Sequence, residues 1–240
     1  MTEIPEGRRR MTAYRLARLS AVTLMLASLG ALSGCTLPFQ DPEPAEPTMN
    51  LERAGRMLTQ SDTNQALPMG SNMPAGYAVA PGNLLQPTRS GTEVVRPARC
   101  QPLYDGIDVD YVKSRTKSFV TYVNSDQAFV GVGVSSRRGS LVGLADSAKL
   151  LGSCPRFTVS QGGETMRITS APLPFPKVGE RSFAARFTLR GTSAPATYDA
   201  VRIQAGHNTV LVDAMTTKQV LPSSAEMEDA ATVVLLNLSR

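Results

Sequence analysis

The chain of 240 residues contains no tryptophan, a single histidine (His207) and three cysteines, and aromatic residues make up only 5% of it. So few aromatic side chains argue against a stacking platform for nucleic-acid bases. A charged fraction of 19% argues against a coiled coil. One histidine and a few distant cysteines do not supply the four ligands of a structural zinc site. We therefore expect no metal and no other cofactor.

Apolar residues are plentiful, at 42%, which is enough to build the core of one domain or of two small ones. The net charge of +5 arises mostly before Cys35, where five basic residues stand against two acidic ones. From Cys35 onward the chain has 20 basic and 18 acidic residues. This near balance gives no reason to expect a nucleic-acid partner.

An uncharged apolar run extends from Leu19 to Leu32 and follows the basic residues Arg15 and Arg18. At about 14 residues it is shorter than the roughly 20 that a membrane-spanning helix needs. A basic start, a short apolar run and small residues after it are typical of a signal peptide, which we place at residues 1–34. Either Met1 or Met11 could be the initiator without changing the mature chain.

The four residues Leu32-Ser33-Gly34-Cys35 resemble the lipobox of bacterial lipoprotein precursors. The resemblance implies that the Cys35 thiol receives a diacylglycerol, that cleavage on the N-terminal side of Cys35 follows, and that the new amino group can then be acylated. Two or three acyl chains hold a protein durably at a membrane, whereas one chain binds only marginally. We expect a protein anchored on the extracytoplasmic face of the cell membrane; the alternative is a secreted protein with a chance cysteine.

Four prolines with acidic residues between them follow the lipobox, within residues 35–50. Proline favours extended backbone, so this linker should be a semi-rigid spacer of roughly 3 Å per residue. The folded, sensor-like part is then expected over residues 51–240.

Cys100 and Cys154 remain once Cys35 carries lipid. Outside the cytoplasm a disulfide is the expected state of such a pair, and two free buried thiols are the alternative. The bond would close a loop of about 55 residues, for which loop entropy gives roughly 4 kcal/mol of stabilisation.

Residues 51–99 start with a weak helical pattern at Leu51, Ala54, Met57 and Leu58, and prolines and glycines then interrupt the chain as far as Arg99. We expect a largely irregular lead-in there.

Beyond Cys100, alternating β-branched and aromatic residues separated by turn residues predict a series of strands. An amphipathic helix is expected from Ser140 to Leu151, and another after the capping box of Ser223 and Glu226. This order favours an α+β fold, an antiparallel sheet with packed helices. The expected strands are residues 119–123, 128–134, 157–160, 165–170, 182–189, 198–204 and 209–215.

Several short motifs lie between residue 51 and the end of the chain. They are Leu67-Pro68, Pro74-x-Gly76-Tyr77, Cys100, Cys154, Gly179-Glu180, Asp199-x-Val201-Arg202-Ile203-x-x-Gly206 and Val210-Leu211-Val212. Together these motifs resemble actinobacterial lipoproteins whose extracytoplasmic domain is similar to the sensor domain of PknH-type Ser/Thr kinases. The resemblance covers roughly residues 51–240. It implies an antiparallel sheet with helices around a cleft, a ligand-binding role and no catalytic residues to carry over.

Four arginines are candidate ligand-binding residues. Arg137 and Arg138 precede the helix expected at Ser140, where guanidinium groups and free helix amides could bind an anion. Arg186 and Arg202 fall on neighbouring expected strands and could line a cleft with Asp199 if they share a face. A solvated turn and ordinary cross-strand charge pairing are the respective alternatives.

Catalytic patterns are weak. His207 lies in an expected turn, with no nucleophile motif to serve it. Ser114 and Lys117 match Ser-x-x-Lys, but they precede a strand rather than open a helix. Gly131-x-Gly133 lies inside a strand with no helix directly after it, so it indicates close packing or a bulge rather than a phosphate-binding loop.

The sequence thus favours a non-catalytic ligand-binding or sensor-like module at the cell envelope. Its partners would be the membrane, through the lipid anchor, and an unidentified envelope ligand or protein. The alternatives are an envelope hydrolase that uses Ser114 or His207, and a structural protein that docks on another envelope protein.

Overall fold

A nine-stranded antiparallel sheet forms the centre of the chain in a computed structural model that describes residues 49–82, 84–87, 92–138, 143–191, 195–218 and 221–240. The strands, in their order across the sheet, are β1 (Ala78–Val79), β3 (Thr116–Val123), β4 (Phe129–Ser136), β9 (Asn208–Thr216), β8 (Ala196–Ala205), β7 (Arg181–Arg190), β6 (Glu164–Pro172), β5 (Arg156–Gln161) and β2 (Val94–Arg96). The expected α+β fold with an antiparallel sheet is confirmed. No helix in these described ranges is long and apolar enough to cross a membrane.

Short turns connect β3 to β4, β5 to β6 and β8 to β9, and strands joined in this way pair antiparallel. Between β3 and β4, the Asn124 Oδ1 atom accepts hydrogen bonds from the backbone nitrogens of Asp126 and Ala128, each at 3.0 Å. Between β5 and β6, Gly162 and Gly163 both have positive φ angles, of 58° and 87°, which glycine adopts without steric cost. All seven expected strands are present, with bounds that differ by at most three residues.

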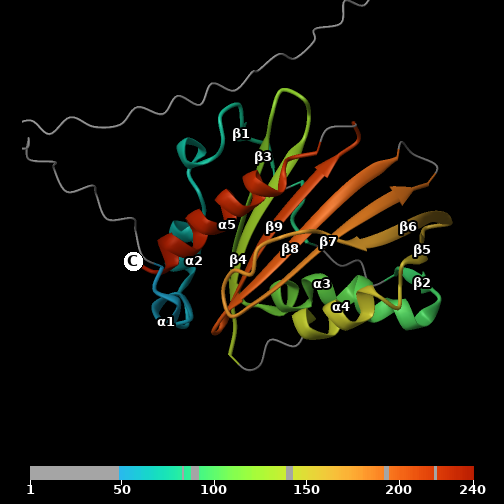
Figure 1. Cartoon of the computed structure of the whole chain (residues 1–240), viewed down its shortest axis with the longest axis horizontal. Helices are drawn as coiled ribbons and strands as arrows, with labels where there is room; N and C mark the ends of the chain where they lie inside the picture. The colour runs from blue at the N-terminus through green and yellow to red at the C-terminus, as the bar shows by residue number, and fades with distance from the viewer. Residues whose placement is uncertain (1–48, 83, 88–91, 139–142, 192–194, 219–220) are drawn as a thin grey trace, which may run out of the picture. The chain divides into compact units, whose positions relative to one another are not determined.

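The helices divide between the two faces of the sheet (Figure 1). Helix α5 crosses β4 and β9 on one face, which we call the α5 face. Helices α3 and α4 lie together on the other, the α3 face. The helices are α1 (Leu51–Ala54), α2 (Gln60–Ala66), α3 (Gln101–Lys113), α4 (Gly143–Leu151) and α5 (Ser224–Leu238), with short 3-10 turns at Gly70–Asn72 and Ala98–Cys100.

Helix α5 starts at the expected capping box, where the Ser223 side chain accepts from the Glu226 nitrogen and the Glu226 carboxylate accepts from the Ser223 nitrogen. Its apolar stripe is buried as the spacing predicts. The stripe packs on buried residues of β4, β8 and β9 and forms the first core. The buried residues of α5 are Met227, Ala230, Ala231, Val234, Leu235 and Leu238.

The second core lies on the α3 face and confirms the alternation along β7, in which Phe183, Ala185 and Phe187 are buried. A disulfide between Cys100 and Cys154, with Cα atoms 5.7 Å apart, is part of this core. The expected disulfide is therefore confirmed. It joins the start of α3 to the segment that follows α4.

Helix α3 was not expected from the sequence. Pro102, Gly106 and several β-branched residues are poor helix formers, and its apolar stripe is weak. Packing stabilises it instead, because it lies along α4 and carries the disulfide at its start. The expected start of α4 at Ser140 lies outside the described residues, and α4 is described from Gly143.

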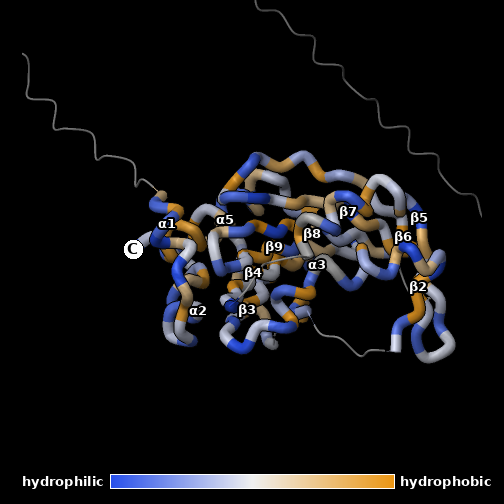
Figure 2. The backbone as a smooth tube through the Cα atoms, turned by 90° about the horizontal axis from the view of Figure 1, so that it is seen from below, coloured by the Kyte–Doolittle hydropathy of each residue, from blue (hydrophilic) through white to orange (hydrophobic). Residues whose placement is uncertain are grey.

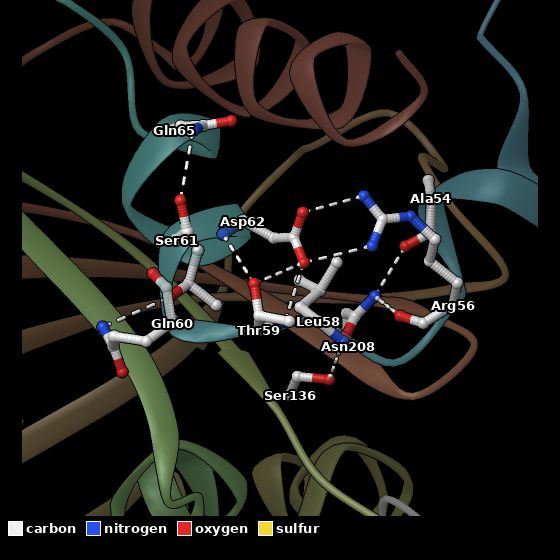
Figure 3. A network of polar contacts seen from close by, with 11 residues as sticks. Ala54, Arg56, Leu58, Thr59, Gln60, Ser61, Asp62, Gln65, Ser136 and Asn208 are labelled. Atoms are coloured by element: carbon white, nitrogen blue, oxygen red, sulfur yellow. Dashed lines mark hydrogen bonds and ion pairs between the residues drawn. The ribbon is translucent and has the colours of Figure 1, made fainter.

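The chain before α3 is attached to the sheet by polar contacts (Figure 3). The Asn208 side chain, at the start of β9, donates from Nδ2 to the carbonyl oxygens of Ala54, at 2.6 Å, and Arg56, at 2.8 Å. The Leu58 nitrogen donates to Ser136 Oγ at 3.1 Å. These bonds fix the segment between α1 and α2 to the ends of β4 and β9.

The helical pattern expected through Leu58 is interrupted, since α1 ends at Ala54 and a new helix starts at Gln60. The reason is a close approach of two glycines. A Cβ atom on Gly55 would lie 3.1 Å from the Gly206 Cα atom, and the His207 nitrogen donates to the Gly55 carbonyl. Between α2 and α3 the described residues are largely irregular, as expected.

Candidate functional site

A cleft of about 340 Å³ opens between α3, the segment 84–86 and the α3 face of the sheet. Cavities of this size accommodate small ligands. Its described lining residues are mostly apolar or aromatic, and none is a lysine or an arginine. They are Leu84, Leu85, Gln86, Glu93, Tyr104, Asp105, Asp108, Phe157, Met166, Ile168, Phe187, Leu189, Tyr198 and Met215.

Strand register forms the floor of the cleft. Phe187 lies directly opposite Tyr198, and Tyr198 lies directly opposite Met215, so these three side chains form one row across β7, β8 and β9. Ile168 and Leu189 are likewise opposite each other on β6 and β7 and continue the floor toward the sheet edge. The floor is therefore apolar because alternate residues of these strands face α3.

A buried charged cluster lies beside the floor. The Arg202 guanidinium, 1% exposed, donates to Asp213 Oδ1 at 2.5 Å and to Asp108 Oδ1 at 2.6 Å. The Tyr198 hydroxyl donates to Asp213 Oδ1 at 2.8 Å. Asp108 comes from α3 and is 28% exposed. One guanidinium thus links two strands of the sheet to the helix that roofs the cleft.

The electrostatics of the cluster follow from two carboxylates sharing one buried cation. The pKa of Asp213 is raised to about 6, because burial and the neighbouring Asp108 charge together outweigh the lowering effect of Arg202. Burial also raises the pKa of Tyr198. Burial alone would lower the pKa of Arg202, but the charges of Asp213 and Asp108 outweigh this and raise it. Asp213 Oδ2 has no hydrogen-bond partner among the described residues.

Arg186 and Arg202 do not share a face. Arg186 is directly opposite Asp199, whereas Arg202 is directly opposite Phe183, three positions along β7, which places the two arginines on opposite sides of the sheet. Arg186 forms a bidentate pair with Asp199, with both distances 2.7 Å. The expected cleft of Arg186, Arg202 and Asp199 is therefore wrong, because an odd spacing along a strand reverses the side-chain direction.

Arg137 and Arg138 follow the end of β4. Arg137 donates to Asp110 of α3 at 3.1 Å, and Arg138 is exposed. The helix start that was expected to complete an anion site lies within residues 139–142, outside the described residues. None of the four candidate arginines lines the cleft, and their binding of a ligand stays a prediction.

The weak catalytic motifs lie in structural positions. Ser114 is buried at the end of α3, where its hydroxyl donates to the Asp110 carbonyl at 2.6 Å. His207 is exposed in the turn between β8 and β9. Gly131 and Gly133 lie under the Phe119 ring, where a Cβ atom on either would approach it within 2.7 Å. The expected close packing at these glycines is confirmed.

Sequence reasoning missed Asp108 and Asp213, although a signal for the latter existed. Asp213 interrupts a run of apolar residues in β9, as Arg202 does in β8. Opposite charges in the middle of two adjacent buried strands indicate an ion pair. Asp108 could not be found in the same way, because α3 itself was not expected. Cys35 lies outside the described residues.

Comparisons with known proteins show a likeness in structure and none in sequence. No protein-family model matches the chain, and no curated protein does. Among solved structures the chain is similar to the extracellular domain of PknH from Mycobacterium tuberculosis, with 15% sequence identity and a TM-score of 0.49. The match covers 77% of this chain and 98% of that one. The proposed function therefore rests on this chain's own residues.

Proposed function

We propose that the chain is a lipid-anchored, non-catalytic module on the extracytoplasmic face of the cell membrane, which acts as a sensor-like domain by binding an apolar ligand between α3 and the sheet. The observation that carries the proposal is the cleft of about 340 Å³ with its apolar floor. The disulfide supports an oxidising compartment. The lipobox at Cys35 supports the anchor.

The lining of the cleft limits the chemistry of the ligand. Its floor offers apolar and aromatic contacts, and the carboxylates of Glu93, Asp105 and Asp108 lie among its lining residues. An apolar body with a neutral or cationic polar end suits such a lining better than an anionic one. Because Asp108 also binds Arg202, ligand contact with α3 would act directly on the link between helix and sheet.

Binding can be tested with the neutral apolar dye N-phenyl-1-naphthylamine, whose fluorescence rises in apolar surroundings. Residues 46–240 form one compact unit with its own cores and disulfide, so the chain from Glu46 onward is suitable. The dye should bind to this chain. Met215→Trp places an indole in the cleft and should weaken dye binding at least tenfold, since it fills the volume that the dye needs.

Met69→Trp is the matched control, because Met69 is 73% exposed and lies outside the cleft. It should leave dye affinity unchanged. Thermal unfolding of both variants shows that they fold. Equal dye affinity in Met215→Trp and the original chain would remove the cleft from the proposal.

The anchor is tested separately with the full chain expressed in a bacterium. The original chain should partition into the detergent phase of a Triton X-114 extract, because several acyl chains make membrane attachment durable. The original chain should also incorporate an isotope-labelled fatty acid, and Cys35→Ala should not. Label retained by the variant would contradict lipid attachment at Cys35.

A further inference from the structure

Four exposed arginines, Arg96, Arg156, Arg167 and Arg190, lie together where the sheet ends in β7, β6, β5 and β2. Strand register sets three of them in one row, since Arg96 is opposite Thr158, Thr158 is opposite Arg167, and Arg167 is opposite Arg190. Residues directly opposite each other project from the same face of a sheet. We call these four residues the arginine patch.

The patch lies on the α5 face of the sheet but away from α5. Arg190 alternates along β7 with Leu189 and Phe187, which face α3, so it points to the other side. Helices α2 and α5 pack at the opposite end of the sheet, on β3, β4 and β9. Hydrophilic and hydrophobic residues alternate along β5, β6 and β7 (Figure 2), as expected where one face is covered and the other is open.

The positive charge of the patch is uncompensated by described carboxylates. None of the four arginines forms an ion pair within the described ranges, whereas Arg186, on the same face, is paired with Asp199. Arg167 and Arg190 are like charges directly opposite each other, an arrangement that disfavours the sheet. An anionic partner would relieve this repulsion.

Phosphate groups are the anions that this patch is best suited to bind. A guanidinium group offers two parallel donors to a phosphate, and the patch lines an open hollow of about 940 Å³ together with threonine hydroxyls. The hollow spreads over four strands, so it suits an extended surface that carries many phosphates. Val94, 51% exposed, lies on the same face two residues before Arg96 and adds an apolar contact at the edge.

We propose that the arginine patch docks the domain on the anionic phospholipid surface of the membrane. The choice of a membrane over a soluble polyanion rests on the proposed anchor at Cys35, which would keep this surface within a linker's length of the domain. Negatively charged leaflets attract basic residues near their surface, and the attraction strengthens partition by about fivefold per residue. Docking would fix which side of the sheet faces the membrane and leave the cleft, on the other side, accessible.

The experiment uses the chain from Glu46 onward, without an anchor, and sedimentation with lipid vesicles. Vesicles of phosphatidylcholine containing about one third phosphatidylglycerol should bind the chain, and vesicles of phosphatidylcholine alone should not. Binding should weaken as salt is added, because salt screens exposed charges.

Arg167→Gln with Arg190→Gln should lower the partition coefficient on the anionic vesicles by about 25-fold, since two basic residues leave the patch. The matched control is Arg115→Gln with Arg181→Gln, which removes the same charge from exposed positions outside the patch. The control should retain most of the binding. Circular dichroism and thermal unfolding show whether both double variants fold as the original chain does.

Three outcomes would overturn the inference: equal binding to both kinds of vesicle, equal losses in the two double variants, or binding to soluble polyphosphate without binding to anionic vesicles. Each of these is independent of dye binding in the cleft and of detergent partition of the full chain. Failure of the arginine patch and failure of the proposed function are thus distinguishable.

Discussion

Arg202 and Asp213 form an ion pair inside the sheet, with Nη1 and Oδ1 2.5 Å apart and side chains that are 1% and 0% exposed. Removing two charges from water costs several kcal/mol for each ion, and their attraction offsets this only in good geometry with further hydrogen bonds. Tyr198 and Asp108 supply such bonds here. The pair thus joins β8 to β9, and Asp108 extends it to α3.

Removing Arg202 while Asp213 remains should strongly lower the free energy of unfolding. In Arg202→Met the Asp213 carboxylate stays buried without its partner, so we expect the free energy of unfolding to fall by about 3–5 kcal/mol. In Arg202→Met with Asp213→Leu no buried charge remains, and most of this loss should be recovered. Urea unfolding measures both, and a double variant less stable than the single one would contradict the reasoning.

An exposed pair provides the control for this prediction. Arg56 pairs with Asp62 at 3.0 Å, but its side chain is 44% exposed (Figure 3). Because exposed pairs contribute little, Arg56→Met should lower the free energy of unfolding by less than about 1 kcal/mol.

Stability should depend on pH through Asp213. Its pKa is about 6 in the folded chain, compared with about 3.9 for an unfolded aspartate. Between these values the folded chain binds more protons than the unfolded chain, so this group favours folding at acidic pH and its contribution is lost as pH rises through about 6. Asp213→Asn does not titrate.

The measurement compares urea unfolding of the original chain and Asp213→Asn across this range. The original chain should gain roughly 2 kcal/mol relative to the variant between about pH 7 and pH 4. A difference in stability that does not change with pH would show that the carboxyl titrates normally.

Position 133 should require glycine, because the Phe119 ring packs directly against it. A Cβ atom there would lie 2.7 Å from Phe119 Cδ2, and Phe119 is buried. Gly133→Ala should therefore lower the free energy of unfolding by about 1–3 kcal/mol. Gly152→Ala, where no heavy atom lies within 4 Å of the new Cβ, should stay within about 0.5 kcal/mol of the original chain. Equal stability of the two variants would rule out the close packing.

The disulfide should stabilise the α3 face more than the α5 face. Replacing Cys100 and Cys154 by serine should lower the free energy of unfolding by about 4 kcal/mol, through the entropy of the opened loop. In this double serine variant, amide hydrogen exchange should speed up more in α3 and α4 than in α5, relative to the original chain. The reason is that the disulfide joins α3 to the segment after α4 and does not contact α5. A uniform loss of protection would contradict this division.

The strands and the last helix could be predicted from the sequence because their signals are local. Alternation along β7 and the capping box at Ser223 each depend on residues a few positions apart. Helix α3 gave no such signal, since its stability comes from the disulfide and from α4, which are distant in sequence.

The sequence by itself was enough to predict the antiparallel α+β class and the pairing of Cys100 with Cys154. It also carries the secretion and lipid-attachment signals, which stay predictions. Tertiary structure decided which charges meet. Arg186 and Arg202 could have lined one cleft only if they shared a face. Arg202 faces the other side of the sheet, where it binds Asp213 from the neighbouring strand and Asp108 from α3. The physical reason is that side-chain direction depends on strand register, and contact with a helix depends on packing, and neither is encoded in local spacing.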